Sequence, residues 1–323
     1  MEYVRFEKDD YGLWDDFVED NYSGTIFHKT QWLKNTDLEF EVYAALENNK
    51  ILGGAVFSYD SIFRKRIYQQ PVLTPYSGFV LADSILKLKN TNRYSNVKKI
   101  KREIFRLCKM KCGKVNYSPY LDIDIHIEKW NGFSNNIGHI YILPLKDINE
   151  IYNNFHRKRI KLMINKAAKD DSIVTEESKD IEIVINLVKL TYQRQGMRLN
   201  IYSTLRKLDN NCNSKAFICI DKRDNKSLAC AYIVYDSKRA YGLVTGYDYK
   251  NAKGYGTTLC LWETIKAAFN LGLKQYDFTG TMLENVDGQL SAFGGNLVSY
   301  AVVSKKIPYY YVNRAMRRFI FLK

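Results

Sequence analysis

Residues 49–61 read NKILGGAVFSYDS, and residues 225–237 read NKSLACAYIVYDS. Asn, Lys, Leu, Ala, Tyr, Asp and Ser recur at matching positions of the two stretches. Self-similarity over this distance indicates that one structural unit is duplicated. The repeat therefore decides how the rest of the chain is read, because each half should contain the same elements in the same order.

Each copy follows an apolar run, at residues 41–47 in the first half and 215–221 in the second. Asn48-Asn49 and Asp224-Asn225 lie where each run meets its copy. These are residue types that β-hairpin turns prefer, because they tolerate a left-handed backbone. The pattern therefore predicts one β-hairpin in each half.

The same order of elements continues after each hairpin. A third strand is expected, followed by a loop that contains Tyr and Gly, an amphipathic helix and a last strand. A strand–helix–strand connection makes the last two strands parallel, with a right-handed crossover. The expected segments of the first and second halves are strands at 67–70 and 240–244, helices at 97–108 (burying Leu107 among others) and 261–268, and strands at 120–124 and 275–279.

The predicted fold class is α/β, with mixed (α+β) sheets in two tandem domains, each a mixed sheet flanked by helices. A length of 323 residues agrees with two domains. Amphipathic helices predicted near 148–155 and 180–195 would open the second domain. We therefore expect a boundary at Pro144, with domains 1–144 and 145–323.

The net charge of +14 is clustered. Residues 86–115 hold eleven Lys or Arg against the single acid Glu103, and residues 156–169 hold six and no acid. Clusters of this kind attract phosphate-bearing partners. A solubilising surface would give the same pattern.

Cysteine and histidine usage predicts neither a metal site nor a disulfide framework. The six cysteines include no CxxC pair, and the four histidines are far apart. The N-terminus has no apolar segment of signal-peptide length. No apolar run approaches the roughly 20 residues that span a bilayer. A cytoplasmic location is expected.

A glycine-containing loop precedes the predicted helix of the second half. Free N–H groups and the helix dipole at such a helix start can hold a pyrophosphate. The glycines permit close approach, Lys253 adds charge and the threonines can cap the helix, although a plain loop would contain the same residues. The predicted donor-binding residues are Lys253, Gly254, Tyr255, Gly256, Thr257 and Thr258.

Four further stretches carry a family resemblance. They are FHKTQWL at 27–33, RKRIKLMINKA at 157–167, YDFTG at 276–280 and LSAFGGNLV at 290–298. The order of these stretches and of the predicted elements resembles that of the GCN5-related N-acetyltransferase (GNAT) fold. The doubled form resembles the FemAB-like group, which includes BioF-like acetyltransferase relatives. The resemblance covers about residues 20–305. Two features depart from it: Asn251 stands where simple members have Gln or Arg, and the long charged helical hairpin of some bridge-forming members is missing.

The resemblance implies an amide-forming acyltransferase. The first hypothesis is transfer from acyl-CoA to an amine acceptor, such as an amino-sugar or a cell-envelope precursor. The second is an aminoacyl-tRNA-dependent peptidoglycan-bridge enzyme, and a third is a non-enzymatic scaffold for polyanions such as RNA. No permanently bound cofactor is implied. Because the donor is already activated, positioning and a backbone N–H for the oxyanion would carry much of the catalysis.

The donor is expected to enter between splayed parallel strands of the second half. Asp277, at the end of the last strand, is the candidate general base and Asp248 its rival, with capping of a turn as the structural alternative for Asp277. The candidate acceptor or tRNA contacts are Tyr76, Ser77, Gly78, Arg157, Arg159, Lys161 and Tyr247. The aromatic and arginine-rich tail at 307–323 would rest on an anionic membrane, where lipid-linked acceptors lie, or pack on its own domain.

Overall fold

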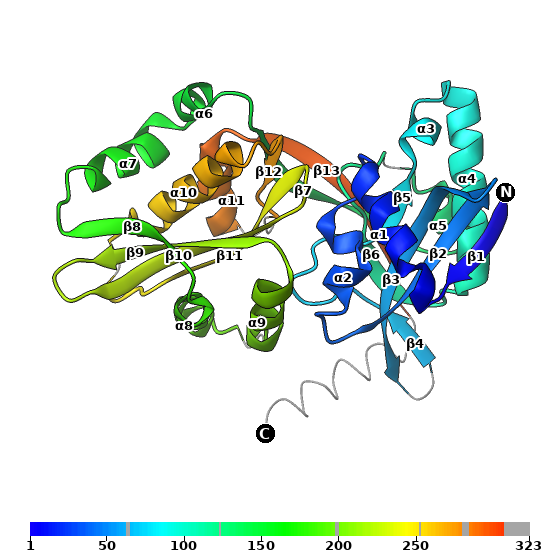
Figure 1. The fold of residues 1–323 in the computed structure, drawn as a ribbon, viewed down its shortest axis with the longest axis horizontal. Helices are drawn as coiled ribbons and strands as arrows, with labels where there is room; N and C mark the ends of the chain where they lie inside the picture. The colour runs from blue at the N-terminus through cyan, green and yellow to red at the C-terminus, as the bar shows by residue number, and fades with distance from the viewer. Residues whose placement is uncertain (63–64, 123, 198–199, 252, 280–283, 307–323) are drawn as a thin grey trace. The chain divides into compact units, whose positions relative to one another are not determined.

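The computed structural model describes residues 1–62, 65–122, 124–197, 200–251, 253–279 and 284–306. The chain forms two compact units (Figure 1). Unit 1 contains residues 1–138 and the segment that begins at Tyr300, and unit 2 contains residues 139–299. The chain therefore crosses between units twice, within strands β7 (Ser134–Pro144) and β13 (Asn296–Lys305). This differs from the single boundary expected at Pro144.

Unit 1 is a mixed sheet with helices. Its strand order is β1-β2-β3-β4-β6-β13, and β5 pairs with β3. Its elements are β1 (Glu2–Phe6), η1 (Lys8–Asp10), α1 (Tyr11–Asp20), η2 (Ile26–His28), α2 (Thr30–Leu33), β2 (Glu39–Glu47), β3 (Lys50–Ile62), β4 (Lys65–Tyr68), β5 (Gly78–Leu81), α3 (Asp83–Leu86), α4 (Asn90–Cys108), β6 (Gly113–Asn116) and α5 (His126–Trp130).

Unit 2 repeats this plan in the strand order β7-β12-β11-β10-β9-β8. In Figure 1, α10 covers one face of β9–β11, and α8 and α9 lie on the other. Its elements are α6 (Ile148–Asn154), a π-helical turn η3 (Arg157–Lys161), α7 (Leu162–Ala167), β8 (Ile173–Ser178), α8 (Ile181–Arg194), α9 (Tyr202–Asn211), β9 (Ser214–Asp221), β10 (Lys226–Tyr235), β11 (Arg239–Tyr247), α10 (Gly256–Asn270), β12 (Gln275–Asp277), α11 (Glu284–Leu290) and η4 (Ser291–Phe293).

Both predicted hairpins are present. β2 pairs with β3, and β9 pairs with β10, in antiparallel register. Asn48 and Asn49 both have positive φ, 51° and 61°, which is the backbone that a two-residue hairpin turn requires. Asn225 has φ 55° at the matching turn of unit 2. The repeat identified in the sequence is therefore a repeat of structure at the hairpins.

The strand expected after the long helix of unit 1 was predicted in the wrong place. It is β6 (Gly113–Asn116), which pairs in parallel with β4, and residues 120–122 form no strand. Helix α4 ends at Cys108 because Lys109 adopts a left-handed backbone (φ 49°), so the chain returns to the sheet at once. Leu107 is exposed, contrary to the prediction, and the buried face of α4 includes Phe105 and Lys101 instead.

Lys101 is buried because a carboxylate is buried beside it. Its ammonium lies 2.6 Å from Glu128 Oε1, and the two side chains are 1% and 0% exposed. Tyr117 donates a hydrogen bond to the same carboxylate oxygen. This ion pair belongs to the core of unit 1.

Within the described part of the chain, no helix is long and apolar enough to cross a membrane.

Helix α8 approaches the sheet of unit 2 most closely at Gly246 in β11. A Cβ at this position would lie 2.5 Å from Val188 N and from Leu187 C, so only glycine fits without moving the helix. This contact matters for function because the C-terminal end of α8 borders the cavity described below.

We expect Gly246→Ala to lower the free energy of unfolding by about 1–3 kcal/mol, because the added methyl group overpacks the α8–β11 contact. Gly12→Ala is the control, since a Cβ there would meet nothing within 4 Å. Urea denaturation of both variants checks the prediction. Equal stability of the two variants would contradict it.

Candidate active site

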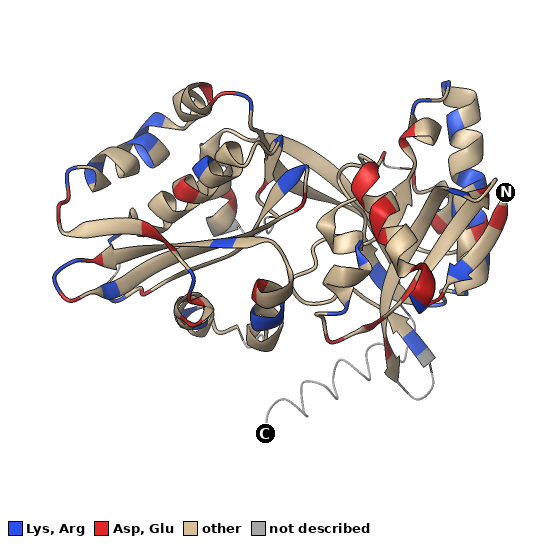
Figure 2. Cartoon of the chain, in the orientation of Figure 1, with Lys and Arg blue, Asp and Glu red and all other residues tan. Residues whose placement is uncertain are grey.

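Unit 2 contains a cavity of about 710 Å³ at the N-terminus of α10. Four basic side chains line it: Lys158 and Arg159 from η3, Arg194 from the last turn of α8, and Lys253 from the loop before α10. No acidic side chain is among the described residues that line it. Figure 2 shows Lys and Arg along the η3–α7 segment. The charge of the lining therefore suits an anionic ligand. We name this space the basic cavity.

The start of α10 strengthens the anion site. The helix has 15 residues and no side-chain cap at its N-cap residue Tyr255. Its first N–H groups and its dipole therefore favour a negative group near Thr257 and Thr258, which line the basic cavity. A Cβ at Gly254 would meet nothing within 4 Å, so the backbone is open to a ligand there.

Gly256 has a different role from Gly254. It is buried in the first turn of α10, and a Cβ there would lie 3.1 Å from Ala229 Cβ. Glycine thus allows α10 to start close to the sheet. Of the six residues predicted to bind the donor, the structure places Lys253, Gly254, Thr257 and Thr258 on the basic cavity; Tyr255 and Gly256 are not among its lining residues.

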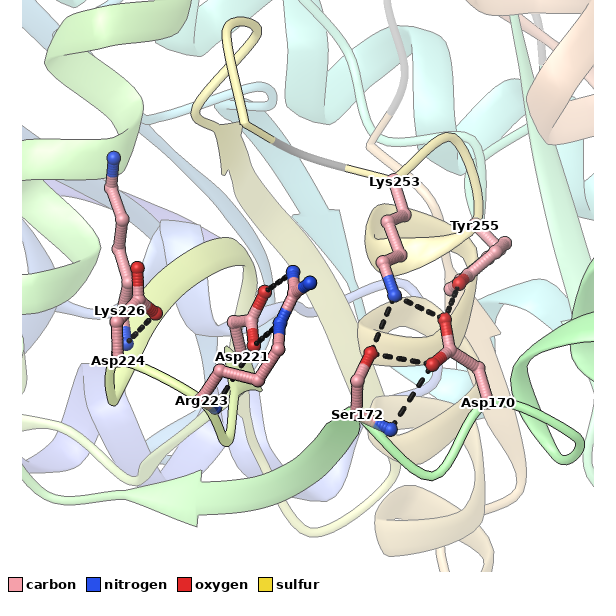
Figure 3. Close-up of polar contacts among 8 residues, drawn as sticks. All are labelled: Asp170, Ser172, Asp221, Arg223, Asp224, Lys226, Lys253 and Tyr255. Carbon is pink, nitrogen blue, oxygen red and sulfur yellow. Dashed lines mark hydrogen bonds and ion pairs between the residues drawn. The ribbon is translucent and has the colours of Figure 1, made fainter.

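A carboxylate from a distant segment holds the loop before α10. Asp170, between α7 and β8, accepts hydrogen bonds from Lys253 Nζ, the Tyr255 hydroxyl and Ser172 (Figure 3). Lys253 Nζ also donates to Ser172 Oγ at 2.6 Å. The hydrogen bond from Lys253 is the main reason why the pKa of Asp170 lies well below its usual range. Asp170 therefore neutralises part of the Lys253 charge, which reduces its attraction for a ligand. We name these four residues the Asp170 clamp.

The parallel strands β11 and β12 separate beside the basic cavity. They pair only at Arg239↔Gln275, Ala240↔Tyr276 and Tyr241↔Asp277. Beyond this point lies a chamber of about 190 Å³, lined by Gly242–Thr245 on one side and by Phe278 and Thr279 on the other. We name it the inner chamber. It adjoins the basic cavity, because Thr191, Gln195, Thr245, Leu261, Val286 and Leu290 line both.

A bulge in β11 faces the inner chamber. Tyr232 of β10 pairs with Val244 of β11, whereas the next residue, Ile233, pairs with Gly242. Leu243 is therefore outside the antiparallel register and lines the inner chamber. Bulges of this kind turn backbone groups away from the ladder and are common beside active sites.

The two candidate general bases lie outside both cavities. Asp277 is 0% exposed and accepts a hydrogen bond from Thr279 N at 2.7 Å. Asp248 is also buried, and burial alone would raise its pKa. Hydrogen bonds from Asn251 and Lys226 outweigh that effect and lower the pKa. Neither carboxylate lines the basic cavity or the inner chamber, so the geometry favours turn-stabilising roles over catalysis.

Of the three basic residues predicted to contact the acceptor, only Arg159 is among the described residues that line the basic cavity. Arg159 lines the basic cavity and donates to the Gly288 carbonyl at 2.7 Å. Arg157 is not among the lining residues, and Lys161 donates to the Asn153 carbonyl at 2.8 Å on the far side of the turn. Tyr247 lines the basic cavity, and its contact with an acceptor stays a prediction.

Two of the basic lining residues were not singled out from the sequence. Lys158 belongs to the same basic run as Arg159, so composition pointed to it without distinguishing it from its neighbours. Arg194 lies with its guanidinium 4.9 Å from the centroid of the Tyr247 ring. No sequence signal marks Arg194, because the packing of α8 on β11 brings it to the site.

Tyr76, Ser77 and Gly78 are buried in unit 1. Tyr76 is 1% exposed and packs edge-on against Phe27, and Ser77 is 2% exposed and donates to Gln70. Gly78 has a positive φ of 95°. The three residues therefore serve packing and turn geometry, and this burial argues against the substrate contact predicted for them. The tail at 307–323 lies outside the described residues.

Comparison with known proteins agrees with this geometry. Residues 154–286 match the family model of an acetyltransferase (GNAT) domain. This segment includes η3, α8, β11, the loop before α10 and β12, which carry many of the residues that line the basic cavity and the inner chamber. Unit 2 carries a GNAT acetyltransferase domain. The protein is therefore an acyltransferase.

Solved structures show the same fold over nearly the whole chain. The crystal structure of FemX is similar with a TM-score of 0.68 and 14% identity, covering 93% of this chain and 97% of that one. The C-terminal domain of a putative lysylphosphatidylglycerol synthetase from Agrobacterium fabrum has a TM-score of 0.57 and 10% identity, covering 93% of this chain and 92% of that one. A tandem GNAT protein from the clavulanic acid biosynthesis pathway has a TM-score of 0.55 and 9% identity, covering 94% of this chain and 98% of that one. No curated protein matches the chain in sequence.

The Asp170 clamp predicts a pH dependence. A carboxylate whose pKa is lowered by folding stabilises the folded state above its unfolded pKa of about 3.9, and this contribution disappears as the pH falls through the folded pKa. We therefore expect Asp170→Asn to lower the unfolding temperature at pH 7, and the difference from wild type to shrink towards pH 2.

The exposed neighbour Asp171 supplies the control as Asp171→Asn. Thermal unfolding of the three proteins between pH 2 and pH 7 measures the effect. A difference between wild type and Asp170→Asn that stays constant over this range would show that the clamp does not act as described.

Proposed function

We propose that the protein transfers an acyl group from a coenzyme A thioester to an amine acceptor, forming an amide. The observation that carries this proposal is the pair of adjoining spaces in unit 2. The basic cavity suits the phosphates of the carrier, and the inner chamber, between the parted strands, suits the acyl group. A volume of about 710 Å³ falls in the range of about 300–1,000 Å³ that small-molecule sites occupy.

The side chains of the basic cavity have distinct parts in donor binding. Lys158, Arg159 and Arg194 would neutralise the phosphates, and the N–H groups at the start of α10 would bind them directly. The Asp170 clamp would keep the loop before α10 in the shape that exposes Gly254. The carrier would then run from this loop towards the bulge at Leu243.

The chemistry needs few protein groups, since a thioester is already activated. The acceptor nitrogen attacks the carbonyl carbon to form a tetrahedral intermediate, which collapses by expelling the thiolate; the proton of the ammonium is released to the thiolate or to water. Holding the two reactants together supplies much of the acceleration. A backbone N–H beside the bulge in β11 would stabilise the oxyanion. The described lining of both spaces contains neither a carboxylate nor a histidine, and Asp277 and Asp248 have no step in this scheme.

The acceptor is proposed to be an amino-sugar or another amine of a cell-envelope precursor, which is phosphate-bearing or lipid-linked. The basic side chains of η3 beyond the basic cavity, Arg157 among them, favour an anionic acceptor. A second candidate donor is an aminoacyl-tRNA. It is favoured by the similarity of fold to FemX and to the lysylphosphatidylglycerol synthetase domain, and by the same basic segment.

Binding of coenzyme A tests the proposal. We expect Lys158→Ala and Arg194→Ala each to weaken binding by about tenfold or more, because each removes a charged hydrogen bond worth about 1.5–3 kcal/mol. Isothermal titration with coenzyme A measures this.

Arg157→Ala is the matched control, since Arg157 precedes Lys158 but does not line the basic cavity; its affinity should stay within about twofold, by the small effect expected of an exposed charge. Competition by charged and uncharged tRNA separates the two donors. Tight, aminoacyl-dependent tRNA binding with no coenzyme A binding would replace the first candidate by the second.

A further inference from the structure

The inner chamber differs from the basic cavity in chemistry as well as in size. None of the described residues that line it carries a charge, whereas the adjoining basic cavity has four basic side chains. A ligand that fills both must be anionic at one end and neutral at the other. The inner chamber therefore bears on which acyl group the protein takes, a point that the family match leaves open.

The polar side chains of the inner chamber are largely engaged with protein groups. The Tyr232 hydroxyl donates to Asp209 at 3.2 Å, and the Tyr276 hydroxyl is bonded to Thr264 at 2.9 Å. Thr279 donates its hydroxyl to the Gly242 carbonyl. The rest of the lining is mainly apolar and includes Leu243, Val244, Met197 and Phe278, whereas Tyr192, Gln195 and Thr245 add uncharged polar groups.

The size of the inner chamber exceeds that of an acetyl group. A volume of about 190 Å³ corresponds to roughly six water molecules at about 30 Å³ each. An acetyl group has three heavy atoms and would leave much of this space empty. An acyl group of about four to six carbons would fill it.

Charge excludes another class of acyl group. An aminoacyl group carries an ammonium on the carbon chain, and no carboxylate lines the described part of the inner chamber. Burying an ammonium without a partner is costly, since the ion loses its hydration and gains no compensating pair. The inner chamber therefore selects against a cationic acyl group of the same size and shape.

We infer that the inner chamber between β11 and β12 is an acyl-selectivity site for uncharged acyl chains of about four to six carbons. This inference rests on the proposed use of coenzyme A thioesters. Adding methylene groups beyond acetyl should strengthen donor binding until the chamber is full. Replacing a terminal methyl by an ammonium should weaken it.

Donor binding, which needs no knowledge of the acceptor, tests this directly. Isothermal titration of the full chain would compare coenzyme A with acetyl-, butyryl-, octanoyl- and β-alanyl-coenzyme A. Butyryl and β-alanyl groups have nearly the same shape and differ by CH₃ against NH₃⁺. We expect butyryl-coenzyme A to bind about fifteenfold more tightly than acetyl-coenzyme A, at about fourfold per methylene. The β-alanyl thioester should bind at least tenfold more weakly than the butyryl thioester.

Met197→Trp links the effect to the inner chamber, because Met197 lines it and does not line the basic cavity. The larger side chain should reduce the advantage of butyryl over acetyl to about twofold or less. Equal affinities of the wild type for all the thioesters, or a preference for β-alanyl, would overturn the inference while leaving the proposed function standing. Failure of coenzyme A and every thioester to bind would instead overturn the proposed function, and the inference with it.

Discussion

The parallel pairing between β11 and β12 ends after three residue pairs, and the candidate site depends on this early separation. Had the ladder continued past Tyr241 and Asp277, the backbone of Gly242–Thr245 would be occupied in hydrogen bonds to β12. The inner chamber would then be closed. The bulge at Leu243 reinforces the separation, because it takes β11 out of register with β10 at the same level. The separation of the two strands thus leaves a space beside the bulge at Leu243, where a carbonyl group could be held.

The separated strands would have no selectivity for a carrier without the start of α10. Gly256 lets this helix begin against the sheet, and the Asp170 clamp fixes the loop that precedes it. The helix then directs its positive end into a cavity that already contains three further cations, Lys158, Arg159 and Arg194. Under the proposed function, neighbouring elements of one unit would therefore supply both the electrostatic attraction for phosphates and the space for an acyl group. Unit 1 repeats the strand and helix order of unit 2, but its counterpart loop is buried at Tyr76 and Ser77.

The features that could be predicted from the sequence are those that neighbouring residues determine, such as turns. The turns at Asn48-Asn49 and Asn225 require residues that tolerate positive φ, so both hairpins were visible. Glycine and lysine before a helix led to the loop of which Lys253 and Gly254 line the basic cavity, and its binding of a donor stays a prediction. The short strand β6 was missed because GKVN has no clear apolar alternation, whereas YLDID at 120–124 does.

Contacts between distant segments could not be predicted. Asp170 binds a lysine 83 residues later in the chain, and Arg194 reaches the basic cavity only because Gly246 lets α8 approach β11. Asp277 was assigned a catalytic role from its place at a strand end. The sequence does not reveal whether a side chain there faces the cavity or the interior, and in the structure it is buried.

A crystal structure with a non-hydrolysable butyryl-coenzyme A thioether would test the central claim most directly. The account predicts the pyrophosphate at the N-terminus of α10, beside Gly254 and Thr257, and the butyryl chain between β11 and β12. A thioether bound elsewhere on the chain, or β11 and β12 joined by a continuous ladder beyond Tyr241 and Asp277, would contradict it.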